Sequence, residues 1–253
     1  MATVDLNCDL GEGYGDWRMG DDAAMLQIVT SVNVACGFHA GDPQVMAQTF
    51  AAAKKAGVAI GAHPGYPDLQ GFGRRHIPYS TTEIERLVAY QLGAAMAVAA
   101  LAGHKITHLK AHGALSNLAA DERPVADAVV RAAKAVDPSL TILAIAGTEI
   151  EHAADHQGMR AAREIFADRA YTPTGRLVPR TQPGAVIHDA ETVATRVVRM
   201  LEAGAVIAVD GTRVPVGIDS ICVHGDTPGA VALASAVRAA VTQAGFDLRP
   251  FAP

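Results

Sequence analysis

Short hydrophobic runs alternate with longer stretches of helical periodicity along the whole chain. The runs are rich in Val, Ile, Leu and Ala and are soon followed by Gly, Pro or Asp, which is typical of buried strands. They lie at residues 4–10, 32–38, 58–62, 106–111, 141–146, 164–167 and 221–223. The segments between them predict helices at residues 21–29, 43–56, 82–101, 123–135, 148–157, 190–201 and 229–244. The pattern therefore predicts a strand followed by a helix, seven times over.

Strands that alternate with helices favour a parallel sheet with right-handed crossovers. Such a sheet is either a closed barrel or an open, doubly wound sheet. The nearly even spacing, without a glycine-rich dinucleotide fingerprint after the first strand, favours the barrel. We therefore predict an α/β fold, an irregular seven-stranded (β/α) barrel that lacks a strand or helix of the TIM barrel. No linker divides the chain, so one domain is expected over residues 1–253.

Three connections are unlike plain loops. Residues 65–80 and 170–188 are long, rich in Pro, Gly and Arg, and follow predicted strands. We interpret both as lids over a site. The segment 206–218 has two β-like pieces around Asp210 and Gly211, which predicts a hairpin before the last strand.

Polar side chains occupy alternate positions near the ends of several predicted strands. A barrel strand is covered by helices on one face and by the lumen on the other, so these polar side chains must point into the lumen. In the first strand, Asn7 and Asp9 point inward while Cys8 faces the helices. The same alternation turns seven more residues inward: Asn33, His39, His63, Lys110, His112, His224 and Asp226. The carboxyl end of the strands is where barrel enzymes build active sites.

These inward groups, with Glu12 and Asp42 beside them, form a cluster of titratable side chains. A lone histidine is most often structural, but four at equivalent strand ends indicate a catalytic site. We predict that Asp9 is the general base and that Lys110 binds anionic oxygens. The four histidines are predicted to be proton carriers or ligands: His39, His63, His112 and His224. The other histidines are expected to be structural or solvated.

Both long loops carry arginines, and the first strand is followed by a glycine-rich run. A guanidinium on a loop suits a carboxylate or a phosphate, although surface solubility explains it equally well. The arginines concerned are Arg74, Arg75, Arg176 and Arg180. The run GEGYG, residues 11–15, has no Lys-Ser/Thr after it, so a tight turn and a phosphate site both stay open.

Composition excludes several classes of protein. The 21 Lys and Arg stand against 26 Asp and Glu, for a net charge of -5 without a basic tract, so no nucleic-acid partner is expected. The 3 cysteines are far apart, which argues against a disulfide framework or a thiolate zinc site and favours a reducing cytoplasm. The acidic N-terminus does not read as a signal peptide, and no apolar run of about 18 uncharged residues suggests a membrane span.

Seven strings of residues run through the chain in a fixed order. They are DLNCDLGEGYG (5–15), NVACGFHAGDP (33–43), GAHPGYPDLQGFGRR (61–75), KAHGALSN (110–117), EIFADRAY (164–171), LVPR (177–180) and ICVHGDTPGAV (221–231). On these strings the chain resembles the LamB/YcsF family. The fourth string in relatives usually reads KPHGALYN, so Ala111 and Ser116 stand in place of a Pro and a Tyr.

The resemblance implies an irregular TIM-like barrel of the glycoside hydrolase/deacetylase type. It also implies a 5-oxoprolinase that works with B and C subunits and opens 5-oxo-L-proline to L-glutamate with ATP, whose counter-ion is Mg. Deacetylases of the broader superfamily hold a divalent metal with one Asp and two His, which Asp9, His39 and His63 could reproduce. The substrate or a phosphate is expected at Asn7, Glu12, Asn33, Asp42, Arg74, Arg75, Arg176, Arg180 and Asp226.

Two other functions remain open at this point. The chain could be a stand-alone metal-dependent amidohydrolase or deacetylase, for which ATP is irrelevant. It could also be a non-catalytic subunit that binds the substrate for its partners. The sequence does not decide whether ATP binds this chain or a partner subunit.

Overall fold

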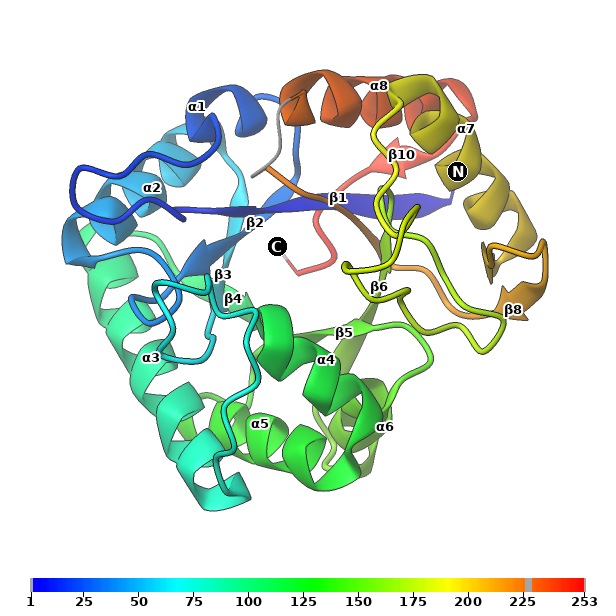
Figure 1. Cartoon of the computed structure of the whole chain (residues 1–253). Helices are drawn as coiled ribbons and strands as arrows, with labels where there is room; N and C mark the ends of the chain where they lie inside the picture. The colour runs from blue at the N-terminus through cyan, green and yellow to red at the C-terminus, as the bar shows by residue number, and fades with distance from the viewer. Residues whose placement is uncertain (1, 226–228, 253) are drawn as a thin grey trace.

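A closed barrel of parallel strands forms the centre of the molecule (Figure 1). The computed structural model describes residues 2–225 and 229–252. Around the barrel the strands are β1 (Thr3–Leu10), β2 (Ser31–Ala35), β3 (Ala59–His63), β4 (Ile106–Leu109), β5 (Thr141–Ile145), β6 (Arg160–Phe166) and β9 (Ser220–Val223). The parallel pairing of β9 with β1 closes the ring. The predicted irregular seven-stranded (β/α) barrel is confirmed.

Helices cover the outside of the barrel (Figure 1). They are α1 (Asp22–Met25), α2 (Pro43–Ala56), α3 (Thr81–Leu101), α4 (Gly113–Asp121), α5 (Arg123–Val136), α6 (Glu149–His156), α7 (Ala190–Ala203) and α8 (Ala230–Gln243). Asp42 caps α2 by accepting hydrogen bonds from the backbone amides of Gln44 and Val45. Ser80 and Glu83 form a capping box at the start of α3. The core lies between strands and helices, where Leu6 and other outward-facing strand residues are fully buried.

Two elements were not predicted from the sequence, and one helix is shorter than predicted. Helix α4 follows β4 after a few residues and begins at Gly113 with a φ of 55°, so its start resembles a loop. The two-residue strand β10 (Asp247–Leu248) pairs with the beginning of β1 and lies outside the closed ring. Helix α1 spans only Asp22–Met25 of the expected 21–29.

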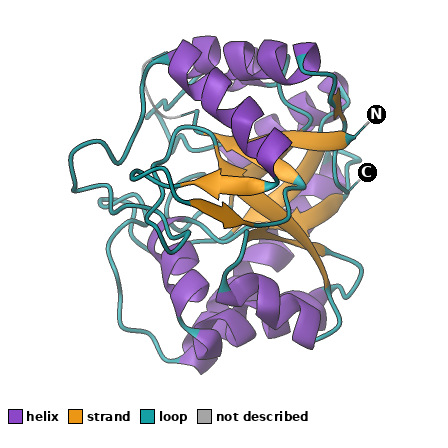
Figure 2. Cartoon of the chain, turned by 90° about the vertical axis from the view of Figure 1, so that its right-hand side faces the viewer, coloured by secondary structure: helices purple, strands orange, loops and turns teal. Residues whose placement is uncertain are grey.

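The two long loops lie at one end of the barrel. Figure 2 shows loops gathered at the end opposite both chain termini. Residues 65–80 connect β3 to α3, and the segment from 167 to 189 connects β6 to α7. The predicted hairpin is confirmed, because β7 (Ala205–Ile207) pairs antiparallel with β8 (Arg213–Pro215). The loops that follow β3 and β6 therefore stand over the carboxyl ends of the strands.

Helix α3 is long and apolar enough to cross a membrane by length and composition. In this structure it packs between α2 and α5 and buries one face, including Ile84, Val88 and Leu92, in the core. A buried helix of a barrel meets the same criterion of length and hydropathy, so the structure accounts for this composition by packing.

Candidate active site

A cavity of about 460 Å³ opens at the carboxyl end of the barrel. Its lining includes the strand-end residues Asp9, His63, Lys110, His112 and His224. The loop after β3 adds Arg74, and the loop after β6 adds Arg176 and Arg180. Side chains from both ends of the sequence thus meet in one cavity, beneath the two loops that we interpreted as lids.

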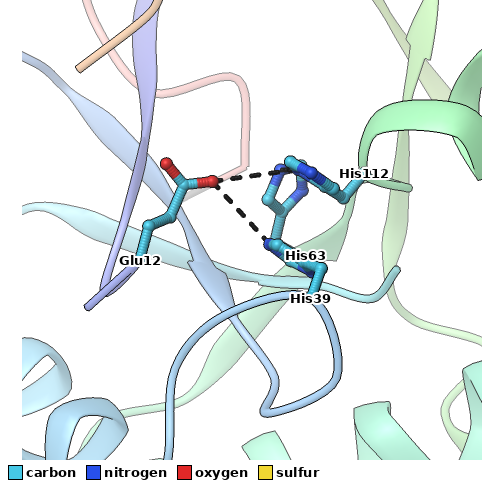
Figure 3. Close-up of side chains that lie close together, drawn as sticks. All are labelled: Glu12, His39, His63 and His112. Carbon is cyan, nitrogen blue, oxygen red and sulfur yellow. Dashed lines mark hydrogen bonds and ion pairs between the residues drawn. The ribbon is translucent and has the colours of Figure 1, made fainter. Parts of the chain in front are cut away.

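A buried cluster of Glu12, His39, His63 and His112 lies beside the cavity, and all of its members except His39 line it (Figure 3). Glu12 lies after β1, His39 after β2 and His112 after β4, whereas His63 is the last residue of β3. Glu12 Oε1 lies 3.7 Å from His39 Nε2 and 3.8 Å from His112 Nδ1. The rings of His39 and His112 stack with their centroids 3.6 Å apart. Burial holds the pKa values of His39 and His112 well below the usual range, so both rings are neutral at pH 7.

The four residues of this cluster each offer a donor atom, and these atoms lie within 4.8 Å of one another. The cluster can therefore hold a metal ion. It differs from the predicted set of Asp9, His39 and His63. The structure places Glu12 and His112 with the two histidines. Asp9 lies beside them, with Oδ2 at 3.5 Å from His63 Nε2 and Oδ1 at 3.1 Å from Lys110 Nζ. The predicted set with Asp9 stays a prediction.

The centre of the cavity floor is a buried ammonium group between two carboxylates. Lys110 Nζ lies 3.1 Å from Asp9 Oδ1 and 2.9 Å from Glu164 Oε1. Burial by itself would lower the pKa of Lys110, but the carboxylate of Asp9 raises it well above the usual value. Burial likewise opposes the charge on Asp9, but His63 and Lys110 hold its pKa well below the usual value. Lys110 is therefore a cation and Asp9 an anion at neutral pH.

The opposite wall holds a histidine supported by a carboxylate. His224 Nδ1 lies 2.8 Å from both carboxylate oxygens of Asp168. Its Nε2 lies 3.0 Å from Arg180 Nη2, which can only donate, so Nε2 accepts and Nδ1 carries the proton. Burial alone would raise the pKa of Asp168, but His224 lowers it below the usual value. The Asp168 carboxylate thus fixes the ring orientation and the tautomer of His224.

Two predicted residues, Asn7 and Asn33, point inward as expected but lie below the cavity. Asn7 Nδ2 donates to Glu164 Oε1 over 2.9 Å, and Asn33 Nδ2 donates to Asp9 Oδ1 over 2.9 Å. His108 Nε2 lies 3.0 Å from Asn33 Oδ1 and completes this layer. Both asparagines therefore position the carboxylates that hold Lys110.

Two other predicted residues, Asp42 and Arg75, are not among the described residues that line the cavity. Asp42 is the cap of α2 and also accepts from the backbone amide of Gly15 over 2.7 Å. Arg75 forms an ion pair with Asp68, and its side chain is 63% exposed. Local backbone and side-chain partners therefore use both groups, and their role in binding stays a prediction. Asp226 lies outside the described residues.

Sequence reasoning missed two functional carboxylates, Glu164 and Asp168. Glu164 alternates with the buried Ile165 on β6, so the inward-facing test would have found it had it been applied to this strand. Asp168 lies just beyond the end of β6, where no periodicity remains. The run of residues 11–15 forms a turn that carries Glu12 into the histidine cluster.

Comparisons with known proteins place the chain in a family. The model of the LamB/YcsF family matches residues 4–253. The A subunit of 5-oxoprolinase from Rhodopseudomonas palustris (strain BisB5) is 58% identical over 98% of both chains. Its counterpart from Azorhizobium caulinodans is 56% identical over 100% of both.

Solved structures agree with this placement. A lactam utilization protein from Thermus thermophilus has a TM-score of 0.93 and 44% identity, with 98% of this chain and 100% of that chain covered. A putative cellobiose-phosphate cleavage protein from Enterococcus faecalis, at 14% identity and a TM-score of 0.54, shares the fold alone. From its strand-end site and its match along nearly the whole sequence, the chain belongs to the LamB/YcsF family.

Proposed function

We propose that this chain is the A subunit of an ATP-dependent 5-oxoprolinase, which opens 5-oxo-L-proline to L-glutamate. The relatives that carry the name of this 5-oxoprolinase component match it over nearly their whole length. The geometry of the site supports the proposal through one observation. The cavity contains cationic side chains that can bind anionic oxygens. It also contains His224, whose ring is within hydrogen-bonding distance of the Asp168 carboxylate and can accept or donate a proton.

The chemistry explains why such a cavity is needed. A lactam is a resonance-stabilised amide, so its carbonyl must be activated before water attacks. In the proposed reaction the γ-phosphoryl group of ATP is transferred to the lactam oxygen and ADP leaves. Water adds to the activated carbon, the C–N bond breaks, and a second water releases phosphate. The sum is one 5-oxoproline, one ATP and two waters converted to glutamate, ADP and phosphate.

The positive side chains of the cavity take the negative charges in this scheme. Arg74, Arg176 and Arg180 line the rim and suit the substrate carboxylate or a phosphoryl group. Lys110 lies deeper and faces the oxygen on which negative charge develops.

We assign the role of general base to His224 rather than to Asp9. An anion held by Lys110, with a strongly lowered pKa, is a weak base. His224 Nε2 presents a lone pair to the cavity, and Asp168 stabilises the positive charge that forms when the ring takes up a proton. Arg180 donates to Nε2 in this structure, so an anionic group that draws Arg180 away frees Nε2 for water.

Partner subunits complete the proposed enzyme. The relatives' names describe one component of a larger enzyme, which supports B and C partners. The chain has no P-loop motif, so the assembled enzyme rather than a loop of this chain is proposed to supply the nucleotide site. A cytoplasmic location is also proposed, because Cys8, Cys36 and Cys222 are free, buried thiols.

The test is an assay with 5-oxoproline, ATP and Mg²⁺, first on this chain alone and then with its B and C subunits. Glutamate and ADP are measured together. The proposal expects both products in equal amounts, and only when the subunits and ATP are present. A complete complex that forms ADP without glutamate, or glutamate without ATP, contradicts it.

A second function is favoured by the cluster of Glu12 and three histidines in the same cavity. Such a cluster suits a stand-alone metal-dependent amidohydrolase or deacetylase. That enzyme would hydrolyse amides without ATP, so omission of ATP separates the two functions. A fully active complex that contains a His224→Gln chain would instead indicate a non-catalytic, substrate-binding subunit.

A further inference from the structure

We propose that this chain binds one divalent transition-metal ion of the zinc class through Glu12, His39, His63 and His112. This inference concerns the chain before any substrate binds, so it does not depend on the proposed 5-oxoprolinase activity. It rests on the hydrogen bonds that set the tautomers of two rings and on a third ring whose nitrogens lack partners.

The tautomers of His63 and His112 follow from their carbonyl partners. His63 Nδ1 lies 2.8 Å from the backbone oxygen of Lys110, and His112 Nε2 lies 2.8 Å from the backbone oxygen of Phe72. A carbonyl oxygen only accepts, so each of these ring nitrogens carries the proton and donates it. The other nitrogen of each ring, His63 Nε2 or His112 Nδ1, is turned toward the cluster.

These two nitrogens face each other. His63 Nε2 and His112 Nδ1 are 3.0 Å apart, and His63 Nε2 also lies 3.5 Å from Asp9 Oδ2. A metal ion between the two rings binds both nitrogens through their lone pairs. The carbonyls of Lys110 and Phe72 are then the outer partners that ligating histidines commonly have.

His39 and Glu12 add two donor atoms to this pair, which gives four candidate ligands. His39 is 1% exposed, and within the described part of the chain neither of its ring nitrogens has a hydrogen-bond partner. A buried polar group without a partner destabilises the fold, and a bond from Nε2 to a metal removes this cost. Glu12 brings the negative charge, with Oε1 at 3.7 Å from His39 Nε2 (Figure 3).

The spacing of these atoms suits one small ion. In a tetrahedral zinc site with bonds of about 2.0–2.1 Å, the ligand atoms lie about 3.3 Å apart. In this cluster the two facing nitrogens of His63 and His112 are 3.0 Å apart. Glu12 Oε1 lies 3.7 Å from His39 Nε2 and 3.8 Å from His112 Nδ1. Three imidazoles and one carboxylate favour zinc and its neighbours over Mg²⁺ or Ca²⁺, which prefer oxygen.

The cavity offers a second group of donors, Asp9, Cys222 and His224, within the same 4.8 Å. The negative charge of that group is already balanced by an ammonium group, because Lys110 Nζ lies 3.1 Å from Asp9 Oδ1 and 3.2 Å from Cys222 Sγ. A second cation there would face the ammonium group directly. The metal is therefore assigned to the cluster with Glu12.

The experiment measures metal binding rather than activity. The chain is purified, stripped with a chelator and titrated calorimetrically with Zn²⁺, and Co²⁺ is added in parallel to follow its visible absorption. We expect one Zn²⁺ per chain, a Co²⁺ spectrum typical of nitrogen and oxygen ligands, and a melting temperature that rises with Zn²⁺. Absence of stoichiometric binding for both ions overturns the inference, since the facing nitrogens would then share a proton.

Matched variants locate the site. Loss of an outer partner of a metal ligand typically weakens metal binding about 10- to 100-fold. Glu12→Gln and His112→Gln remove ligands themselves, so they should weaken Zn²⁺ binding by more than this factor. Cys222→Ser and His224→Gln are the controls, from the second group of donors and outside the cluster, and should bind Zn²⁺ within a few-fold of the original chain. Circular dichroism verifies that each variant folds, and Glu12→Gln changes no more than a charge. Loss of binding in the controls with retention in the cluster variants assigns the ion to the second group and overturns the inference.

Discussion

The ammonium nitrogen of Lys110 lies 2.9 Å from Oε1 of Glu164, inside the barrel and at the floor of the cavity. Asn7 donates to the same oxygen, and Asp9 holds the other side of the ammonium. This arrangement keeps a cation fixed where an anionic oxygen of a substrate would arrive. If the proposed function holds, stability and activity depend on the same buried charges.

Removing the buried cation should destabilise the fold. Lys110→Met leaves the carboxylates of Asp9 and Glu164 without their shared partner, which typically costs about 3–5 kcal/mol. The free energy of unfolding in urea measures this. Lys55→Met, at an exposed position of α2, is the control and should change it by less than about 0.5 kcal/mol. Equal stability of the two variants would show that the buried pair contributes little.

The Asp168→Asn variant should lose turnover more than substrate binding. The amide cannot stabilise a protonated His224, and general acid–base catalysis contributes about 10²–10⁴-fold. In the assembled enzyme kcat should fall by this factor, while KM stays within a few-fold. Asp189→Asn removes a carboxylate that only caps α7, so it should leave kcat near the original value. A fall in both variants would assign the effect to the loop rather than to the histidine.

Gly73 tests the close packing around the histidine cluster. A Cβ at this position would lie 2.7 Å from His39 Cβ and 2.8 Å from His112 Cδ2. Gly158 has a similar φ, 71° against 62°, but open space around a Cβ. Both alanine variants carry the strain of a left-handed residue, about 1–2 kcal/mol. Gly73→Ala should lose about 1–3 kcal/mol more and displace the cluster.

Denaturation of the two glycine variants gives the difference in stability directly, and Zn²⁺ titration of the folded proteins reports on the cluster. If Gly73→Ala matches Gly158→Ala in both measurements, the cluster tolerates a shift of its rings.

Asp5 should make the protein less stable as the pH rises. Burial raises its pKa from 3.8 to about 6, despite a hydrogen bond from the Ser220 hydroxyl. The folded state therefore holds a proton that the unfolded state releases, so this stabilisation is present below pH 3.8 and is lost as the pH rises through about 6. A shift of about 2 units corresponds to about 3 kcal/mol in all, of which about 1.4 kcal/mol falls between pH 5 and pH 8.

The Asp5→Asn variant lacks this titration. Between pH 5 and pH 8 its free energy of unfolding should fall by about 1.4 kcal/mol less than that of the original chain. His108 has the opposite effect, since burial lowers its pKa to about 3 and its neutral ring destabilises the fold in acid. It is present in both proteins and cancels in the difference. Parallel pH curves for the two proteins would disprove the assignment.

Local patterns in the sequence were enough to predict the barrel and most of its cavity. Hydrophobic runs marked the strands of the closed ring, and alternation of side chains turned Asp9, His63 and Lys110 inward. This works because side chains of a strand alternate between two faces, so the residues of each strand by themselves show which side chains share a face. The hairpin around Asp210 was read from turn chemistry in the same way.

Only the tertiary structure decided which of these groups touch. Alternation tells that His39 and Asp9 share a lumen, but the register between strands and the path of the turn after β1 place Glu12, not Asp9, with His39 and His112. Glu164 is the partner of Lys110 because only β5 separates β4 from β6 in the ring, and both side chains point into the lumen. A side chain's facing direction is a local property, whereas a contact of about 3 Å depends on the position of every strand in the ring.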